Sequence, residues 1–294
     1  MAELKWDATG ERTYETGVDH GVLYQIDQAG EYVDGVAWNG LTTVTESPSG
    51  AEASPQYADN IKYLNLVSAE QFGATIEAFT YPIEFEQNDG SAAPTVGVSV
   101  GQQSRKPFGF SYRTRKGNDL EGTDHGYKLH LIYGAQAAPS EKAYATINDS
   151  PEALTFSWEV TTTPVEVGTV GSVDYKPTAS ITIDSTKVDP AKLADLEELL
   201  YGTASTDPTM PLPAAVITMM SGTVTEATPT EPSFNAATDT ITIPVVTGVR
   251  YTIDGETVTG DVVITEDTLV KAYPETGYRF PDVVDDEWVF DFTP

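Results

Sequence analysis

The sequence predicts a mainly β protein with one flanking α-helix and a small second β domain at its C-terminal end. Apolar and polar residues alternate with a period of two in several short segments, which is typical of half-buried strands. One segment alone has helical spacing with a capping residue at each end. A change of composition near residue 221 then separates a second group of short strands. Hydrophobic residues make up 39% of the 294 residues, which is enough for packed cores.

The first 220 residues carry most of the strand pattern. In Tyr127–Tyr133, aromatic and leucine side chains face one way, and Lys128, His130 and Ile132 face the other. Leu154–Val160 alternates in the same manner. The segment Ser68–Phe79 opens like a capped helix, but its second half favours a strand. Strands are predicted over Gly21–Ile26, Ile61–Val67, Thr95–Val100, Gly109–Thr114, Tyr127–Tyr133, Leu154–Val160 and Ala179–Asp184.

The predicted helix lies between Asp189 and Gly202. Asp189 is the expected N-cap, Pro190 takes the first helical position, and Gly202 follows the last turn. One apolar stripe is expected along the helix, formed by Leu193, Leu196, Leu199 and Leu200.

After the helix, Ser221–Asp239 is rich in Thr, Pro and Ala and has no periodicity. We expect three parts: a first domain over 1–220, an extended linker over 221–237 and a small β-sandwich over 238–294. Its strands are predicted over Thr240–Val245, Val249–Asp254, Asp261–Thr265, Thr268–Pro274 and Glu287–Phe292. Its expected core is Tyr273, Tyr278, Phe280, Trp288 and Phe290.

The charge and the residue types argue against several functions. The chain has 45 acidic and 16 basic residues, a net charge of −29, so its surface repels nucleic acid and anionic membranes. It has no cysteine, and no phosphate-binding, dinucleotide-binding or nucleophile motif. His20 and His125 each lie in an Asp-His-Gly tripeptide, which we interpret as two turns. We predict no catalytic, cofactor-binding or metal-binding residue. The polar N-terminus predicts synthesis without export.

Two features suggest contacts between subunits. The connection Tyr133–Asp149 is too long for a hairpin loop and rich in small residues. Five of the 16 bases lie within twelve residues, next to aromatic side chains. This basic segment is either a nucleic-acid patch or a contact with an acidic face of another subunit, and the net charge favours the second. The bases are Arg105, Lys106, Arg113, Arg115 and Lys116.

Several blocks of the first 220 residues resemble the major tail tube protein of long-tailed (siphovirus-type) bacteriophages. These are Gly101–Asp119, Gly126–Val165 and Pro211–Met220, with shorter likenesses at Gly21–Tyr24 and Gln56–Asn60. The C-terminal part resembles the immunoglobulin-like modules that are appended to phage tail and capsid proteins.

The resemblance implies a β-sandwich or barrel-like fold whose six copies close a ring. The rings stack into a hollow tube that conducts DNA into the host cell. The expected partners are further copies, the tape measure protein, and the tail terminator and distal tail proteins. The protein is then a structural virion component, not an enzyme, assembled in the host cytoplasm without membrane insertion. Genomic DNA passes an acidic or neutral lumen without specific binding, because a basic lumen would hold it.

Within this picture the long connections are packing surfaces. Ser140, Glu141 and Lys142 supply polar contacts to a neighbouring subunit, and Thr45–Pro55 is the candidate for contact between rings. The C-terminal domain is expected to project outward and to contact host-surface glycans. Two alternatives stay open: a capsid-decoration or surface-binding β-sandwich protein with a carbohydrate-binding C-terminal module, and a β-sandwich hydrolase that uses a carboxylate pair.

Overall fold

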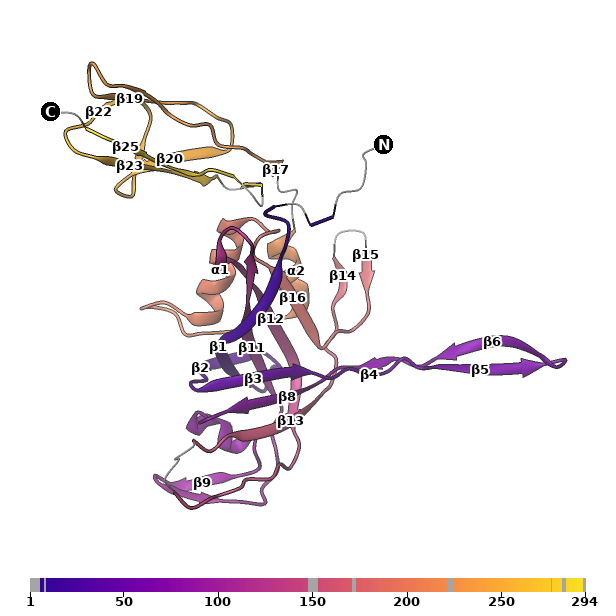
Figure 1. The fold of residues 1–294 in the computed structure, drawn as a ribbon. Coiled ribbons are helices and arrows are strands. Elements are labelled where there is room, and N and C mark those ends of the chain that lie inside the picture. Colours follow the sequence, from indigo (N-terminus) through magenta and orange to yellow (C-terminus); the bar gives the residue numbers. More distant parts are fainter. Residues whose placement is uncertain are drawn as a thin grey trace.

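The computed structural model describes residues 6, 7, 9–147, 153–170, 173–221, 225–275, 277–281 and 284–292. Within these residues the protein is mainly β, with one large antiparallel sheet and several small sheets toward the C-terminal end (Figure 1). The prediction of a mainly β chain is therefore confirmed.

The large sheet has eight strands in the described part of the chain, in the order β2-β1-β11-β12-β13-β8-β3, with β16 paired to β12. The edge strands β2 and β3 are consecutive in the chain and are joined by residues 38–40, so the sheet curves back on itself. The strands are β1 (Tyr14–Ile26), β2 (Tyr32–Ala37), β3 (Leu41–Glu46), β8 (Gly73–Ala78), β11 (Phe108–Asn118), β12 (Gly122–Ala137), β13 (Phe156–Thr162) and β16 (Ser180–Asp184).

Strand β12 contributes to two hydrophobic cores, one on each face of the sheet. Up to Tyr133 its side chains alternate as predicted: Leu129, Leu131 and Tyr133 join the core beneath the helices, and Ile132 joins an aromatic core around Trp158. A bulge at Gly134 shifts the register with β11, so that the next residues change face and join the aromatic core. The strand also changes partner here, from β16 to β13.

Helix α1 (Pro190–Tyr201) confirms the predicted helix. The Asp189 carboxylate accepts a hydrogen bond from the Ala191 amide at 3.0 Å, and Gly202 ends the helix at a φ of 73°. Three of the four leucines of the stripe are buried, but Leu199 is 40% exposed, so its inclusion was wrong.

A second helix, α2 (Pro213–Met220), was not predicted. It has no side-chain cap and only eight residues, so its sequence carries little helical signal. It packs beside α1 and buries Val216 in the core beneath the helices. A short 3₁₀ helix, η1 (Ile83–Gln87), buries Phe85 against Trp38 and Trp158.

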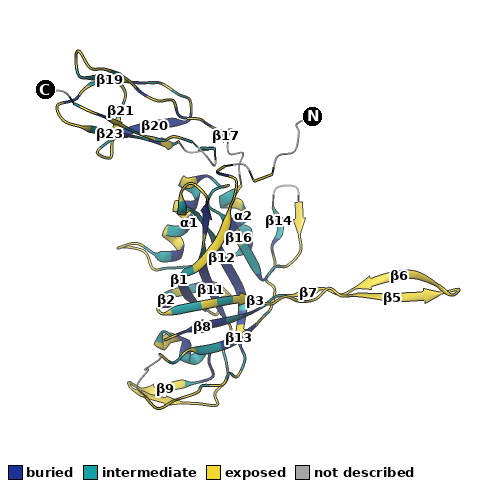
Figure 2. Cartoon of the chain, in the orientation of Figure 1, coloured by how far each residue is buried: buried dark blue, intermediate teal, exposed yellow. Residues whose placement is uncertain are grey.

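Three hairpins project from the large sheet (Figures 1 and 2). The longest, which we call the arm (residues 47–72), consists of β4 (Ser49–Gly50) and β7 (Glu70–Gln71) followed by β5 (Ala53–Ala58) and β6 (Ile61–Val67). The other two are β9 (Ala92–Thr95) with β10 (Val98–Val100), and β14 (Gly168–Val170) with β15 (Val173–Tyr175).

The hairpins correct two expectations. The single strand predicted over Thr95–Val100 is wrong, because the chain turns at Val96 and Gly97 between β9 and β10. The segment Thr45–Pro55, interpreted as a connection, contains strand residues from β3, β4 and β5. By contrast, the predicted strand Ile61–Val67 matches β6, and the choice of strand for the second half of Ser68–Phe79 is confirmed by β8.

The C-terminal residues form small sheets around a third hydrophobic core, which includes Ile241, Tyr251 and Val270. One sheet has the order β18-β19-β22 and another β21-β20-β23-β25, while β17 pairs in parallel with β24. All five predicted strands are present, as β19, β20, β22, β23 and β25.

The strands of the C-terminal sheets have the following bounds: β17 (Thr225–Glu226), β18 (Ser233–Asn235), β19 (Thr240–Ile243), β20 (Val249–Ile253), β21 (Glu256–Val258), β22 (Gly260–Val263), β23 (Thr268–Pro274), β24 (Tyr278–Arg279) and β25 (Glu287–Phe290).

The structure differs from the predicted linker and from the predicted core. Within 221–237, residues 225–235 supply β17 and β18, and Ala227 is buried in the third core. The Tyr251 hydroxyl donates a hydrogen bond to the Thr230 carbonyl at 2.7 Å, which holds this segment against the sheets. Of the predicted core aromatics, Phe290 is buried, but Tyr273 is 42% exposed.

Candidate functional site

The basic segment is divided into two groups by strand β11. Arg105 and Lys106 precede the strand, whereas Arg113, Arg115 and Lys116 lie toward its other end. A rise of about 3.4 Å per residue separates Lys106 from Lys116 by roughly 30 Å. The five bases therefore do not form one patch, although they are neighbours in the sequence.

Arg113 and Arg115 share one carboxylate, that of Asp19 on β1. The Arg113 Nε lies 3.1 Å from Asp19 Oδ1, and the Arg115 Nε lies 3.2 Å from Oδ2. Arg113 also lies 3.6 Å from Glu197 of α1 and covers the Tyr127 ring. Burial raises the pKa of Asp19, but hydrogen bonds from Arg113 and His20 outweigh it, so the pKa falls below its ordinary value.

Lys116 is buried in an ion pair of its own. Its Nζ lies 2.9 Å from Asp184 Oδ2 on β16 and 2.7 Å from the Thr186 hydroxyl. Burial raises the pKa of Asp184, but hydrogen bonds from Thr186 and Lys116 outweigh it and lower the pKa. Lys116 thus joins β11 to β16 within one chain, and little of its side chain is exposed.

The carboxylate of Asp89 contacts both Arg105 of the basic segment and Lys142 of the long connection after β12. Arg105 Nη1 lies 3.3 Å from its Oδ1, and Lys142 Nζ contacts its Oδ2. Lys142 also lies over the Tyr81 ring, at 5.1 Å from its centroid. The opening part of the long connection after β12 is therefore held against the body by charged contacts within the chain.

The other predicted residues of this end lie nearer to solvent. Lys106 is exposed and donates to the Gln87 side chain at 2.9 Å, while Ser140 donates to the carbonyl of Ala138 at 3.2 Å. Glu141 is exposed, and no ion pair is found for it within the described ranges. Beyond Lys142 the connection exposes Tyr144 and Ile147 before it leaves the described residues at 148–152.

Large apolar side chains are exposed on every one of the three projecting hairpins. The arm alone carries six of them, which the strand pattern of the sequence did not reveal as exposed. They are Tyr57, Ile61, Tyr63, Leu64, Leu66 and Val67 on the arm, Val96, Val98 and Val100 on the β9–β10 hairpin, and Val173 and Tyr175 on the β14–β15 hairpin.

A sequence signal for the arm does exist. Strand β5 ends at Ala58 and β6 begins at Ile61, so Asp59 and Asn60 form a two-residue hairpin turn. Both have positive φ, 50° and 63°, as a type I′ turn requires, and Asp and Asn tolerate this conformation. The Asp-Asn pair between two strand-like segments therefore indicates a hairpin.

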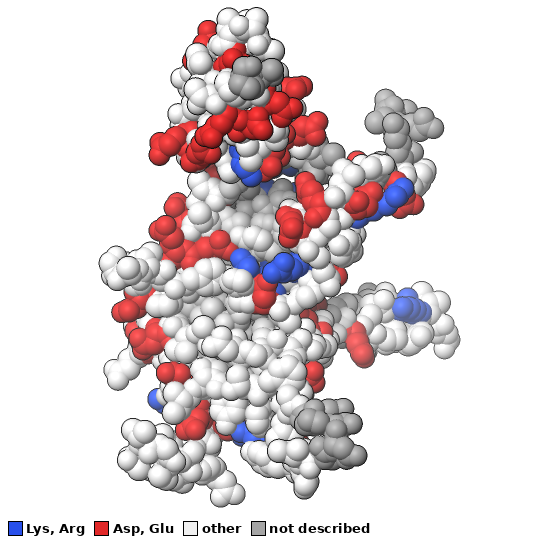
Figure 3. Space-filling model, turned by 60° about the vertical axis from the view of Figure 1, so that its left-hand side comes forward, with Lys and Arg blue, Asp and Glu red and all other residues white. Residues whose placement is uncertain are grey.

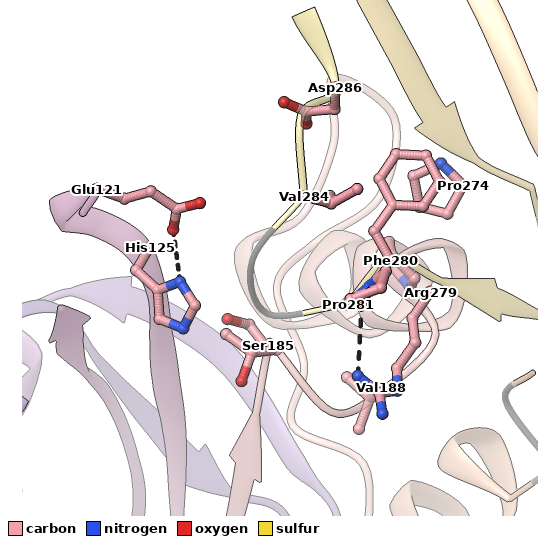
Figure 4. A pocket seen from close by; sticks show the side chains of 12 residues that line it. Glu121, His125, Ser185, Val188, Pro274, Arg279, Phe280, Pro281, Val284 and Asp286 are labelled. Carbon is pink, nitrogen blue, oxygen red and sulfur yellow. Dashed lines mark hydrogen bonds and ion pairs between the residues drawn. The ribbon is translucent and has the colours of Figure 1, made fainter. Parts of the chain in front are cut away.

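The histidines lie in strands and not in the predicted turns, since both Asp-His-Gly tripeptides fall inside β1 and β12. His125 contacts Glu121 and lines a cavity of about 180 Å³ between the body and the C-terminal sheets, which contribute Arg279 and Asp286 (Figure 4). The buried His125 Nε2 has no hydrogen-bond partner among the described atoms. In the part of the chain that is described, no group of three or more acidic or histidine side chains is placed to hold a metal ion.

Acidic side chains outnumber basic ones on the surface. Figure 3 shows them in patches on the visible face, most densely on the C-terminal sheets, with few bases between them. Residues 221–294 contain 14 acids and 3 bases. None of the described helices is both long and apolar enough to cross a membrane.

No known protein family and no curated protein matches this chain.

Proposed function

We propose that this protein is a structural subunit that assembles with copies of itself. The observation that carries the proposal is the set of large apolar side chains on the three projecting hairpins. A two-stranded ribbon is marginally stable in water by itself, and exposed apolar patches mark sites of association. Hairpins that expose such residues in several directions fit an assembly in which each copy contacts several neighbours.

The particular assembly that we propose is the phage tail tube: rings of six copies that stack into a hollow tube and conduct DNA into the host cell. The resemblance of the 101–119, 126–165 and 211–220 blocks supports it. A ring forms when the contact between neighbouring copies repeats until it returns to the first copy. Stacking of rings uses a second contact that repeats without closing and so gives a filament. Under this proposal the tape measure, tail terminator and distal tail proteins are further partners.

The distribution of charge supports a conduit more than a DNA-binding protein. Arg105, Arg113, Arg115, Lys116 and Lys142 each have an acidic partner within the chain, so they offer little free positive charge to phosphates. We propose that the small C-terminal sheets form an immunoglobulin-like module on the outside of the tube, where repeated copies multiply weak contacts with host glycans.

Electron microscopy of the purified protein tests the proposal. Negative-stain images at rising protein concentration are expected to show rings or hollow filaments, and light scattering is expected to show species far larger than the 31.6 kDa chain. A surface-decorating protein would remain without filaments. A strictly monomeric protein across concentration and salt would contradict self-assembly.

A further inference from the structure

We propose that Glu46, Tyr112 and His130 form a proton-sensitive latch that fixes the direction in which the arm leaves the body. Glu46 is the last residue of β3, and the arm begins at the next residue, Ser47. The latch acts within one chain, so it goes beyond the proposed assembly and does not depend on it. It is carried by contacts across the interior of the sheet, by the pairing of the strands and by the groups around the imidazole.

The strand pairing turns Glu46 toward the aromatic core. Glu46 pairs with Ala74 of β8, and Tyr112 of β11 pairs with His130 of β12. Paired residues share a face of the sheet, and both Ala74 and Tyr112 belong to the aromatic core. In the order β12-β13-β8-β3, Glu46 lies three strands away from His130, so a contact between the two crosses the interior of the curved sheet.

Glu46 is held by two side chains at this crossing. The Tyr112 hydroxyl donates a hydrogen bond to Glu46 Oε1 at 2.7 Å, and His130 Nδ1 lies 3.4 Å from the same oxygen. The imidazole is stacked on the Tyr112 ring, with 4.5 Å between the centroids and 2° between the planes. Burial and then the Glu46 carboxylate raise the pKa of Tyr112, so its hydroxyl keeps the proton that it donates.

The surroundings of His130 suit the ring both with and without its second proton. Its Nε2 lies 3.0 Å from the Thr114 hydroxyl, and its Nδ1 lies 3.4 Å from the Thr182 hydroxyl. A hydroxyl can donate or accept, so Nε2 has a partner as a bare nitrogen and as an N–H group. The added proton therefore leaves neither ring nitrogen unpartnered, and it places a positive charge beside Glu46.

Two other charged groups near the latch are paired. Lys128 of β12 also attracts Glu46, but its Nζ contacts Glu15 of β1. Asp184 of β16 lies opposite Lys128 in the strand register and is paired with Lys116 at 2.9 Å. The imidazole is thus the group whose charge changes between neutral and mildly acidic solution.

The two ends of the arm are anchored differently. At the returning end, the Thr162 hydroxyl of β13 donates to the carbonyl of Phe72 at 2.7 Å, a bond without charged groups. At the outgoing end, the Ser47 amide donates to the Gly73 carbonyl at 2.8 Å, which joins the two ends only to each other. Glu46 ties the outgoing end to β11 and β12, and Figure 1 shows the arm extending away from β3 at this point. Loss of the contact lets β3 and the arm move relative to β11 and β12.

The contacts give the latch a definite dependence on pH. The hydrogen bond with His130 is the largest effect on the pKa of Glu46 and holds it below its ordinary value of 4.5, although burial opposes this. The contact is therefore complete above pH 4.5 and is lost as the pH falls through the lowered pKa. Imidazole groups gain a proton between about pH 8 and 5. We expect the latch to be tightest near pH 5, looser near pH 8 and open in strong acid.

Fluorescence energy transfer in single molecules tests the latch. The chain has no cysteine, so Gln56→Cys on the arm and Gln28→Cys at the exposed turn before β2 take a pair of dyes. At picomolar concentration the copies stay apart, and the spread of transfer efficiencies reports how far the arm moves. Glu46→Gln keeps an oxygen for Tyr112 but removes the charge, and Glu52→Gln is a matched control at the exposed start of the arm.

The wild type and Glu52→Gln are expected to show a spread about twofold narrower near pH 5 than near pH 8, whereas Glu46→Gln keeps the wider spread at both. His130→Phe, which keeps a ring stacked on Tyr112 but cannot take up the proton, is expected to match Glu46→Gln. A thermal melt checks that each variant is folded.

A wild-type spread that is equal at the two pH values overturns the latch, and so does a folded Glu46→Gln variant that keeps the wild-type response. A wild-type protein that forms no filaments contradicts the proposed function and leaves the latch standing, because the measurement is made on separate chains.

Discussion

Asp19 is the centre of an ion-pair network that connects β1, β11 and α1. Its carboxylate holds Arg113 and Arg115, and Arg113 reaches Glu197 of α1. We expect Asp19→Asn to lower the free energy of unfolding by about 1–3 kcal/mol, because Arg113 then loses its charged hydrogen-bond acceptor in a partly buried site. Urea denaturation measures the change.

The half-exposed Arg115 provides the control for this prediction. Arg115→Gln removes an ion pair that solvent screens, so its expected cost is about 0–1 kcal/mol. Equal losses for Asp19→Asn and Arg115→Gln would mean that the Arg113 pair is worth no more than a surface ion pair.

The lowered pKa values of Asp19 and Asp184 predict a loss of stability in acid. Each carboxyl has a lower pKa in the folded chain than its unfolded value of 3.8, so the folded state binds its protons less readily. Their stabilisation is complete well above pH 3.8 and is lost as the pH falls through the folded pKa.

Urea midpoints at pH 7, 4 and 2.5 check this sign. The wild type is expected to lose stability below about pH 4, and a variant with Asp19→Asn and Asp184→Asn is expected to start lower at pH 7 and to lose less over the same range. A steeper acid loss in the double variant would contradict the assignment of these two groups.

At the scale of the element, the bulge of β12 depends on Gly134. Its φ is 58°, and an added Cβ would lie 2.1 Å from the carbonyl oxygen of Thr163. We expect Gly134→Ala to destabilise the protein by about 3 kcal/mol or more, through the left-handed backbone and the contact with Thr163 together. Chemical denaturation gives the value.

Gly122 is a matched control for the bulge, since its φ is 63° and an added Cβ would meet nothing within 4 Å. Gly122→Ala should cost only the conformational strain, about 1–2 kcal/mol. If the two variants lose the same stability, the contact with Thr163 is relieved by a backbone movement.

The sequence predicts those elements whose pattern is local. The alternation in Tyr127–Tyr133 and the caps at Asp189 and Gly202 are properties of neighbouring residues, and the structure confirms both. Helix α2 was missed because burial against α1, and not capping, stabilises it. The change of face at Gly134 depends on the partner strand, which no local pattern contains.

The candidate site was predictable to a smaller extent. Spacing in the sequence suggested one basic patch, but an extended strand carries Lys106 and Lys116 far apart. The acids that neutralise these bases, such as Asp19 and Asp89, come from distant segments. The sequence indicated β6 as a strand, yet only the three-dimensional structure shows that this strand pairs with β5 alone.

For the whole molecule, the residue at which the C-terminal sheets begin has a measurable consequence. Since β17, β18 and Ala227 belong to the C-terminal sheets, we expect residues 225–294 expressed alone to fold as a monomer with a cooperative melt. Residues 238–294 lack this segment and should melt at a lower temperature or without cooperativity. Equal melts for the two fragments would show that residues 225–237 add no stability.

The same division predicts the behaviour of the rest of the chain. A chain stopped after Met220 is expected to assemble into filaments that are thinner by the lost outer density, because the arm and the other hairpins all precede that point. The Gly277 amide donates to Asp189 at 2.6 Å, so a small loss of α1 stability should accompany the truncation. Electron microscopy compares the filaments. A truncated chain that folds but does not assemble would place the C-terminal sheets in the assembly interface.

The two-residue turn at Asp59 and Asn60 also bears on the order of events after synthesis. Strands β5 and β6 are neighbours in the chain, and such hairpins close in about 1–10 μs. The body pairs β1 with β11 across roughly ninety residues, and sheets with such distant partners fold in milliseconds to seconds. The arm can therefore form and reopen many times before the body closes, and we expect the slow closure of the body to set the moment at which a copy can be added.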